Sequence, residues 1–408
     1  MAGPPEWAVR GRAIVGEPMA ITLANLLASP FDDELRLVYA DQQQRLGDPR
    51  GELAVVQDRL RRHPADAALR ERERQLFAEH GEALLGALAG KCGPIVEADD
   101  KQSLGASWHQ GFIRRARLQL TAARERETPP LYDALLELAS AALIEHLELR
   151  VRFVWTRAVF FSEYVDKLIA RGPRPALRVL EIGGFVDFAP RWGGPGHCYV
   201  ERDISAVYLG KVGALWPLCP RLEEVRLHGN CAELGPELAL PALRVFELCG
   251  SSCGKESLAV LARATWPRLE RLVLWFGDCE YSSEETCDWD DVAQLLASLE
   301  AGCPRLSHLA LANSTCTDEI LETLALAPPI RLLSRLRGLD LSLGTLGPTG
   351  VRWLLALAPH LGGLTWLNIA NSYLDRESLA RLAAAWPGCT ILDGSQSSDA
   401  ERYCSVSE

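Results

Sequence analysis

The sequence of 408 residues is 48% hydrophobic with a formal net charge of -11, so it can bury a large core but offers little basic surface for nucleic acid or anionic lipid. No apolar stretch reaches the roughly 20 residues that cross a bilayer, and the first 20 residues lack the apolar segment of a signal peptide. We therefore expect a cytoplasmic protein with reduced thiols, a protein partner, and no nucleic-acid or membrane partner.

The N-terminal part of the chain predicts a small helical domain. Residues 1–18 are expected to be poorly ordered, and residues 19–105 to form an all-α domain. Asp32 and Asp33 can cap one helix, and the turn Gly47-Asp48-Pro49 leads into a second helix over residues 51–61. A longer, repetitive domain is expected to follow over residues 106–394.

A short frame, L-x-x-L-x-L, recurs in the repetitive domain. Its copies begin at Leu177, Leu222, Leu243, Leu269, Leu306, Leu336 and Leu364. From Leu222 onward the copies lie 21 to 37 residues apart, around the roughly 20 to 29 residues of leucine-rich repeats. The L-x-L part predicts a short parallel strand whose alternate side chains enter the core. Residues 111–120 and 147–153 alternate similarly and are interpreted as degenerate early copies.

Apolar residues at helical spacing separate the strands. Helices are predicted at residues 131–144, 162–170, 256–264, 292–299, 350–357 and 377–385, and several of them end at a Trp-Pro or Cys-Pro pair. Each unit is therefore strand, turn, helix and turn. This order predicts an α/β solenoid, a horseshoe with parallel strands on its concave face and helices outside.

The turns and ends of the solenoid have their own signals. Asn230, Asn313 and Asn371 follow strands at or next to the position where a side-chain amide can satisfy the turning backbone. Residues 187–207 depart from the frame and are interpreted as an irregular repeat or loop. A last strand is predicted at residues 389–393, and residues 395–408 are expected to form a polar tail.

Two stretches resemble known bacterial proteins. Residues 336–342 and 364–371 resemble bacterial leucine-rich-repeat proteins in which strands alternate with full helices. Residues 26–41, L-L-A-S-P-F-D-D-E-L-R-L-V-Y-A-D, followed by L-G-D-P-R-G-E at 46–52, resemble the repeat-companion domain that precedes such repeats in myxobacteria and related bacteria. That family usually has Trp and Leu where this chain has Gln42-Gln43, which puts the usual surface of the domain in question. The resemblance implies a bacterial repeat protein and no particular chemistry.

Residues 250–254 match the G-x-S-x-G turn of hydrolases, and Ser252 follows a predicted strand and precedes a predicted helix. The repeat architecture supplies this context in every unit. No motif identifies a base, an orienting acid or an oxyanion hole, so a hydrolase using Ser252 is kept only as the alternative function.

Nucleotide and metal sites are also disfavoured. The turn at residues 250–254 is one residue short of a phosphate loop, and Glu256 stands where magnesium needs Ser or Thr. Cys231, Cys249 and Cys253 lack the paired C-x-x-C motif of a zinc site. We therefore expect no cofactor and no metal.

The longest repeat contains an insertion over residues 278–291 with seven acidic residues and no basic one. The plainest interpretation is a solvated loop in which Asp288 or Asp290 caps the next helix. Calcium binding is disfavoured because the D-x-D-x-D-G spacing is missing. A sharper hypothesis is that Tyr281 and Trp289 help the insertion to contact a basic partner, because insertions in solenoids map to one face.

Residues that flank the central leucines of each strand should point to the concave face. The candidates for partner binding are Glu224, Arg226, His228, Glu247, Arg271, Trp275, His308, Asp340, Trp366 and Asn368, with Tyr281 and Trp289 from the insertion. Trp275 and Trp366 are expected to be exposed and to act as hot spots, since tryptophan is enriched in such positions. Packing against neighbouring long side chains is the equally weighted alternative.

These features together predict a non-enzymatic interaction module or scaffold. It would bind a protein through the concave face and the acidic insertion. A further possibility is the recognition subunit of a larger bacterial effector assembly, which would need a separate catalytic partner.

Overall fold

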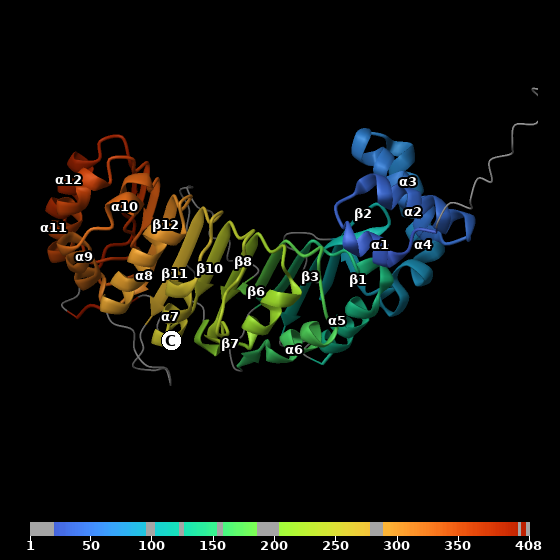
Figure 1. Cartoon of the computed structure of the whole chain (residues 1–408), viewed down its shortest axis with the longest axis horizontal. Coiled ribbons are helices and arrows are strands. Elements are labelled where there is room, and N and C mark those ends of the chain that lie inside the picture. The colour runs from blue at the N-terminus through green and yellow to red at the C-terminus, as the bar shows by residue number, and fades with distance from the viewer. Residues whose placement is uncertain are drawn as a thin grey trace, which may run out of the picture.

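The computed structural model describes residues 20–94, 103–121, 126–152, 158–185, 204–277, 289–398 and 401–404. Its main feature is one long, curved sheet that runs the length of the molecule (Figure 1). The strands of this sheet, in spatial order, are β1 (Cys92–Pro94), β2 (Leu104–His109), β3 (Phe112–Thr121), β4 (His146–Arg152), β6 (Val179–Phe185), β8 (Glu224–His228), β10 (Val245–Cys249), β11 (Arg271–Gly277), β12 (His308–Ser314), β13 (Gly338–Asp340), β14 (Trp366–Asn368) and β15 (Thr390–Leu392). All neighbours pair in parallel except β2 and β3, which are antiparallel.

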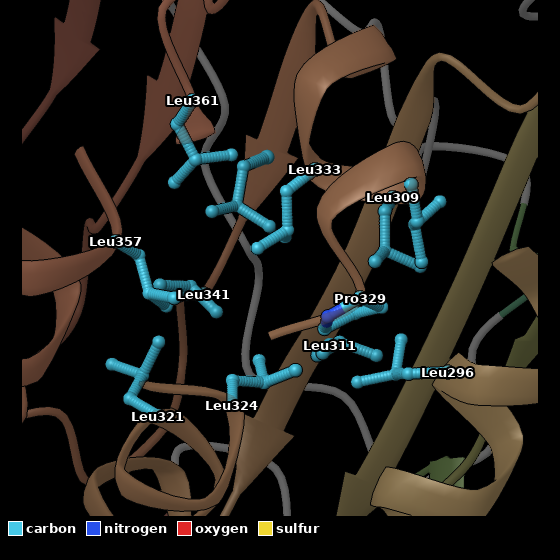
Figure 2. Close-up of a pocket in the computed structure, with 12 residues that line it drawn as sticks. Leu296, Leu309, Leu311, Leu321, Leu324, Pro329, Leu333, Leu341, Leu357 and Leu361 are labelled. Atoms are coloured by element: carbon cyan, nitrogen blue, oxygen red, sulfur yellow. The ribbon is translucent and has the colours of Figure 1, made fainter. Parts of the chain in front are cut away.

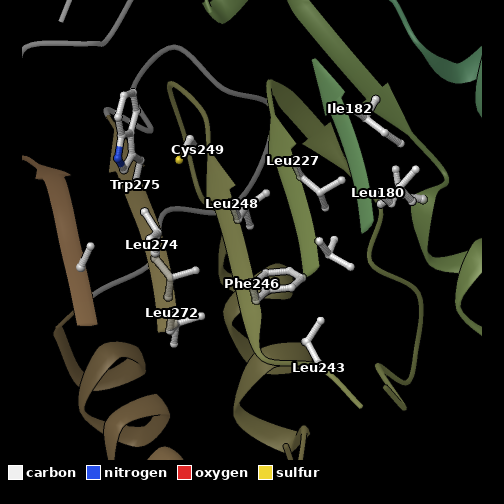
Figure 3. Close-up of a cluster of buried hydrophobic side chains, with 14 of the residues drawn as sticks. Leu180, Ile182, Leu227, Leu243, Phe246, Leu248, Cys249, Leu272, Leu274 and Trp275 are labelled. Carbon is white, nitrogen blue, oxygen red and sulfur yellow. The ribbon is translucent and has the colours of Figure 1, made fainter. Parts of the chain in front are cut away.

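The leucine frame produces this sheet. Each of the seven predicted copies coincides with a strand, from β6 to β14, so the parallel-strand prediction is confirmed. Alternate side chains such as Leu227, Leu248 and Leu274 leave their strands toward one common core (Figure 3). They are buried, and each buried leucine contributes roughly 1.5 to 3 kcal/mol relative to an exposed one.

Helices cover the outer side of the arc (Figure 1). They are α5 (Thr128–Glu137), α6 (Ser162–Ala170), α7 (Lys255–Arg263), α8 (Trp289–Gly302), α9 (Thr317–Leu326), α10 (Ile330–Arg335), α11 (Pro348–Leu357) and α12 (Arg376–Ala385). Shorter 3-10 turns lie at Gly86–Leu88, Ala139–Ala141, Ile204–Ala206, Val212–Leu218 and Ala358–His360. This mixed α/β arrangement agrees with a leucine-rich-repeat solenoid. No helix in the described ranges is long and apolar enough to cross a membrane.

Three buried tryptophans bind the outer layer together. The indole N–H of Trp216 donates to the carbonyl of Leu234 at 2.9 Å. Trp266 and Trp386 donate in the same way to other loop carbonyls, each at 3.2 Å. The Trp-Pro pairs that mark helix ends in the sequence therefore also satisfy backbone carbonyls of neighbouring segments.

A second, smaller sheet was not anticipated from the sequence. It is parallel and contains β5 (Val159–Phe160), β7 (Val207–Gly210) and β9 (Asn230–Ala232). These strands have two, four and three residues, too few to stand out as alternating segments in the sequence. Most of the segment interpreted as an irregular repeat, residues 186–203, lies outside the described residues.

Four helices precede the sheet: α1 (Leu23–Ala28), α2 (Asp33–Arg45), α3 (Pro49–Arg62) and α4 (Ala67–Leu85). They contact the first strands through polar bonds, as when the Gln57 side chain accepts from the backbone of Gly111 at 2.9 Å. The sheet begins earlier than expected, because β1 and the start of β2 fall within residues 19–105. The strand pairing of β1 with β2 thus continues the solenoid into the segment expected to be all-α.

Residues 395–398 and 401–404 pack against the start of α9 and the loops that follow β13 and β14, and we call them the C-terminal strap. The Gln396 side chain donates to the Ile369 carbonyl at 2.8 Å and accepts from the Leu374 N–H at 3.0 Å. Arg402 lies 3.0 Å from the Asp318 carboxylate, and it also donates to a loop carbonyl. The polar residues of this segment therefore bond to three successive repeats.

Between α8 to α11 and strands β12 and β13 lies a small cavity of about 10 Å³ (Figure 2). Eleven leucines and Pro329 line it. It has room for about one water, but its walls provide no polar partner, so we interpret it as a dry packing gap and not a ligand site.

Candidate interaction surface

The strand register arranges the side chains opposite the core in rows that cross the sheet. The first row contains Arg115, His146, Val179, Glu224, Val245, Arg271, His308, Gly338, Trp366 and Thr390. The second row, two residues later in each strand, contains Arg117, Glu148, Glu181, Arg226, Glu247, Val273, Ala310, Asp340, Asn368 and Leu392. Because the strands are parallel and in register, like positions of successive repeats become neighbours.

In its N-terminal half the second row is a buried ion-pair network. Glu148 is fully buried, and its carboxylate lies 2.7 Å from Arg117 and 2.9 Å from Arg150, with Arg115 also in contact. Burial raises the pKa of Glu148, but the charges of Arg150, His146 and Arg117 outweigh it and hold that pKa below its ordinary value. Arg150 continues the network to Glu181 at 2.9 Å.

The network goes on across β8 and β10. Arg226 lies 2.6 Å from Glu224 and 3.4 Å from Glu247, and His228 lies 3.6 Å from the same Glu247 carboxylate. Burial opposes ionisation of Glu247, yet the His228 hydrogen bond and the Arg226 charge keep its pKa below the ordinary value. These buried charges hold the strand face in one arrangement.

The first row is more accessible. Glu224, Arg271, His308 and Trp366 are all half-buried. Burial, together with the charge of Arg271, lowers the pKa of His308. Gly338 lets two of these rings approach, since a Cβ there would lie 2.7 Å from the His308 ring and 3.2 Å from the Trp366 ring. The first row therefore presents polar and aromatic groups at fixed spacing on successive strands.

The structure buries several of the predicted binding residues. Trp275 is only 5% exposed, so the expectation that it is an exposed hot spot is wrong. His228 and Glu247 are buried in the ion-pair network. Asp340 and Asn368 are also buried, and they bond to each other at 3.1 Å. The repeat frame gives the face on which each side chain lies, but its burial depends on the side chains of the neighbouring repeats.

The acidic insertion can be placed only at its end. Residues 278–288, with Tyr281, lie outside the described residues. Trp289 begins α8 and is 47% exposed, and Asp290 and Asp291 follow it in the first helical turn. Asp291 lies 3.6 Å from Lys255 at the start of α7.

Neither a hydrolase site at Ser252 nor a metal site is assembled in the described parts of the chain. Ser252 forms an isolated bridge with Gly277, and the neighbouring Ser251 exchanges hydrogen bonds of 2.9 and 2.8 Å with the Asn230 side chain. No hydrogen bond joins Ser252 to a histidine in the described parts of the chain. In those parts there is also no group of three metal-ligating side chains.

A further row runs along the edge where the strands begin, and we call it the rim. Its members are Arg114, Glu145, Arg178, Glu223, Arg244, Glu270, Ser307, Arg337 and Thr365. Each backbone N–H donates to the carbonyl of the preceding member at 2.7 to 3.0 Å. The sign of the charge alternates as far as Glu270.

Side-chain pairs accompany this alternation. Arg178 binds both carboxylate oxygens of Glu223 at 2.9 and 2.7 Å, and Arg244 binds Glu270 likewise at 3.1 and 2.9 Å. Sequence reasoning missed the rim, although a signal was present. The residue after the first leucine of the frame changes sign from one copy to the next over the first four copies, Arg178, Glu223, Arg244 and Glu270.

No protein-family model matches the sequence. A search of curated proteins gives no significant match either. Among solved structures, a protein from Bacteroides fragilis is 18% identical, with a TM-score of 0.56 over 83% of this chain and 86% of that chain. An internalin from Listeria monocytogenes (14% identical, TM-score 0.29, 69% and 81% covered) and the leucine-rich-repeat protein LegL7 from Legionella pneumophila (14%, 0.32, 68% and 82%) are more distant. The first similarity is one of fold alone, and the other two are too weak to support an inference about this chain.

Proposed function

We propose that this chain is a non-enzymatic protein-interaction module that binds its partner across the strand face. The observation that carries the proposal is the first row, whose polar and aromatic side chains stay accessible at one position of successive strands. Glu224, Arg271, His308 and Trp366 form its central part, and Arg226 of the second row lies 2.6 Å from Glu224. The second row supports the proposal, because its buried charges fix the strands, and it holds Glu224 of the first row in place through Arg226.

Such a surface suits a folded or extended protein partner. A row spaced by about 4.8 Å per strand offers regularly placed donors and acceptors, with Trp366 as an anchor of the kind enriched in hot spots. The seven acidic residues of the insertion remain a candidate second contact, for a partner with a basic surface.

The test compares partner capture by two single variants. Trp366→Ala removes a half-buried indole from the strand face, and Trp353→Ala removes a half-buried indole from the outer helix α11. We expect recovery of bound protein from a native lysate to fall at least about tenfold for Trp366→Ala and to stay within twofold for Trp353→Ala.

Equal recovery with both variants would argue against the strand face as the binding surface. A partner that the unsubstituted chain recovers and the Ser252→Ala variant does not would instead support the hydrolase. Thermal unfolding of each variant shows whether a loss arises from unfolding.

A further inference from the structure

The rim changes character after Glu270. From Arg114 to Glu270 each arginine has a carboxylate beside it. The next rim members are Ser307, Arg337 and Thr365, so the alternation of charge stops. Arginines are nevertheless present near this part of the rim. Arg268 and Arg305 stand two residues before Glu270 and Ser307 in the sequence.

Three exposed arginines therefore stand on adjacent strands. Arg268 precedes β11, Arg305 precedes β12 and Arg337 precedes β13, and all three are exposed. In the described part of the chain none has a carboxylate within ion-pair distance, whereas Arg244 next to them is paired with Glu270 at 2.9 Å. Arg337 donates one hydrogen bond, to the Gly363 carbonyl, at 2.9 Å.

The earlier part of the rim already serves as a docking surface within the molecule. The ring of Phe31, from the turn between α1 and α2, lies 5.4 Å from the guanidinium carbons of both Arg178 and Arg221. Arg36 of α2 lies 3.4 Å from Glu145 of the same rim. The helices α1 and α2 thus cover the rim at β4 to β8, and the arginines at β11 to β13 continue that interface.

We propose that Arg268, Arg305 and Arg337 bind an extended acidic segment of a protein partner. This surface is separate from the strand face and adds a second contact to the proposed function. The two-pronged arginine–carboxylate pairs at Arg178 and Arg244 show the chemistry that this edge accommodates, with the carboxylate supplied from a neighbouring strand. At Ser307 that carboxylate is missing from the chain and comes from the partner.

Geometry and net charge favour a protein segment over nucleic acid. Arg268 and Arg305 stand two residues before the rim residues Glu270 and Ser307, and Arg337 is itself a rim residue, so the three arginines lie at the beginnings of three successive strands. An extended peptide with acids at alternate positions presents its carboxylates on one side, ~7 Å apart, to such an edge. Over longer distances the net charge of -11 repels a long polyanion. A short acidic segment experiences mainly the local arginines, because salt screens more distant charges beyond about 8 to 10 Å.

Fluorescence anisotropy with a labelled dodecapeptide of alternating Glu and Ser tests the proposal on the full chain. The rim variant is R268Q/R305Q/R337Q. The control variant, R352Q/R376Q/R381Q, removes three exposed arginines from helices α11 and α12 on the outer side. We expect the dissociation constant of the peptide to rise at least about tenfold for the rim variant, to change less than twofold for the control, and to rise with salt.

Several outcomes would overturn the proposal. They are no binding of the Glu-Ser peptide, equal binding of a Gln-Ser peptide, or an equal loss in both variants. Tighter binding of a twelve-nucleotide oligothymidylate through the same arginines would assign the rim to nucleic acid instead. If the triple variant unfolds, the dissociation constant of the peptide is measured for R305Q alone, since Arg305 is exposed and its replacement should not unfold the chain. Failure of the unsubstituted chain to bind the Glu-Ser peptide, with Trp366-dependent capture intact, would overturn this inference and leave the proposed function standing.

Discussion

Single residues with left-handed backbone close successive repeats. Asn313, Leu343 and Asn371 occupy equivalent positions five residues after the start of β12, β13 and β14, and all have a positive φ, between 52° and 65°. The left-handed conformation costs most residues roughly 1 to 2 kcal/mol, and Asn tolerates it better. The asparagines that the sequence marks as turn residues therefore act here through backbone conformation, whereas the Asn230 side chain bridges to the next repeat.

Asn371 offers a direct test of this conformational role. Its backbone N–H donates to the Gly394 carbonyl at 2.8 Å, which any residue can do in the same conformation. We expect Asn371→Ala to lower the free energy of unfolding by about 1 kcal/mol, and Asn371→Gly to lower it less, because glycine adopts positive φ freely. Urea unfolding measures both. An equal loss would show that the amide side chain, and not the backbone, governs this turn.

Among the elements, the C-terminal strap is the one whose release should change the structure only locally, where it packs. Arg402 binds Asp318, whose other oxygen accepts from the Gly347 N–H at 2.8 Å at the start of α11. A Cβ at Gly347 would lie 2.0 Å from the Arg402 guanidinium, so any other residue there would displace the end of that side chain. Cys404, two residues further on, is 1% exposed.

We expect Arg402→Ala to release the end of the strap. Alkylation of Cys404, followed by mass spectrometry, should become at least about tenfold faster, while the free energy of unfolding falls by less than ~1 kcal/mol, since the ion pair is partly exposed. Arg376→Ala, an exposed arginine of α12, is the control. Unchanged Cys404 reactivity in Arg402→Ala would show that the strap is held by its other contacts.

Elements with a clear period could be predicted, and polar elements could not. Helix α6 has the predicted bounds, and α12 begins one residue before its prediction, because apolar residues recur at helical spacing there. The strap was expected to be a polar tail. Its Gln396 and Arg402 are polar because they bond to loop carbonyls and a carboxylate, and composition does not distinguish such a segment from a solvated one.

For the whole molecule, the buried charges of the strand face predict sensitivity to acid. Burial, with the charge of Arg115, lowers the pKa of His146 to about 4 although Glu148 lies 3.2 Å away. The unfolded chain, with a histidine pKa of about 6.5, binds more protons than the folded chain between pH 6.5 and 4. The free energy of unfolding therefore falls as the pH falls through this range.

The carboxyls extend the effect to lower pH. The pKa values of Glu148 and Glu247 are depressed in the folded chain, so their contribution is present above about pH 4.5 and is lost as the pH falls through the folded values. Urea unfolding between pH 7 and 5 should show a loss on the order of 2 kcal/mol from His146 alone. His146→Gln should flatten the slope in this range and keep the steeper loss below pH 4.5. An unchanged slope would contradict the assignment to His146.

The site was harder to predict than the fold for a physical reason. The positions of the first and second rows follow from the period of two, and Glu224, Arg226 and Trp366 were assigned to the strand face on that basis. Their burial depends on the size and charge of neighbours one repeat away, as for Trp275 and Glu247. A pattern within one repeat does not contain that information, because each side chain packs between repeats.

The alternating rim also limits how this solenoid can change length. Deleting one unit between β4 and β11 would place two arginines or two glutamates on adjoining strands, with like charges in contact. Deleting two successive units would restore the alternation. The part of the chain from β4 to β11 should therefore gain and lose repeats only in pairs, whereas the part beyond β11 can tolerate single units.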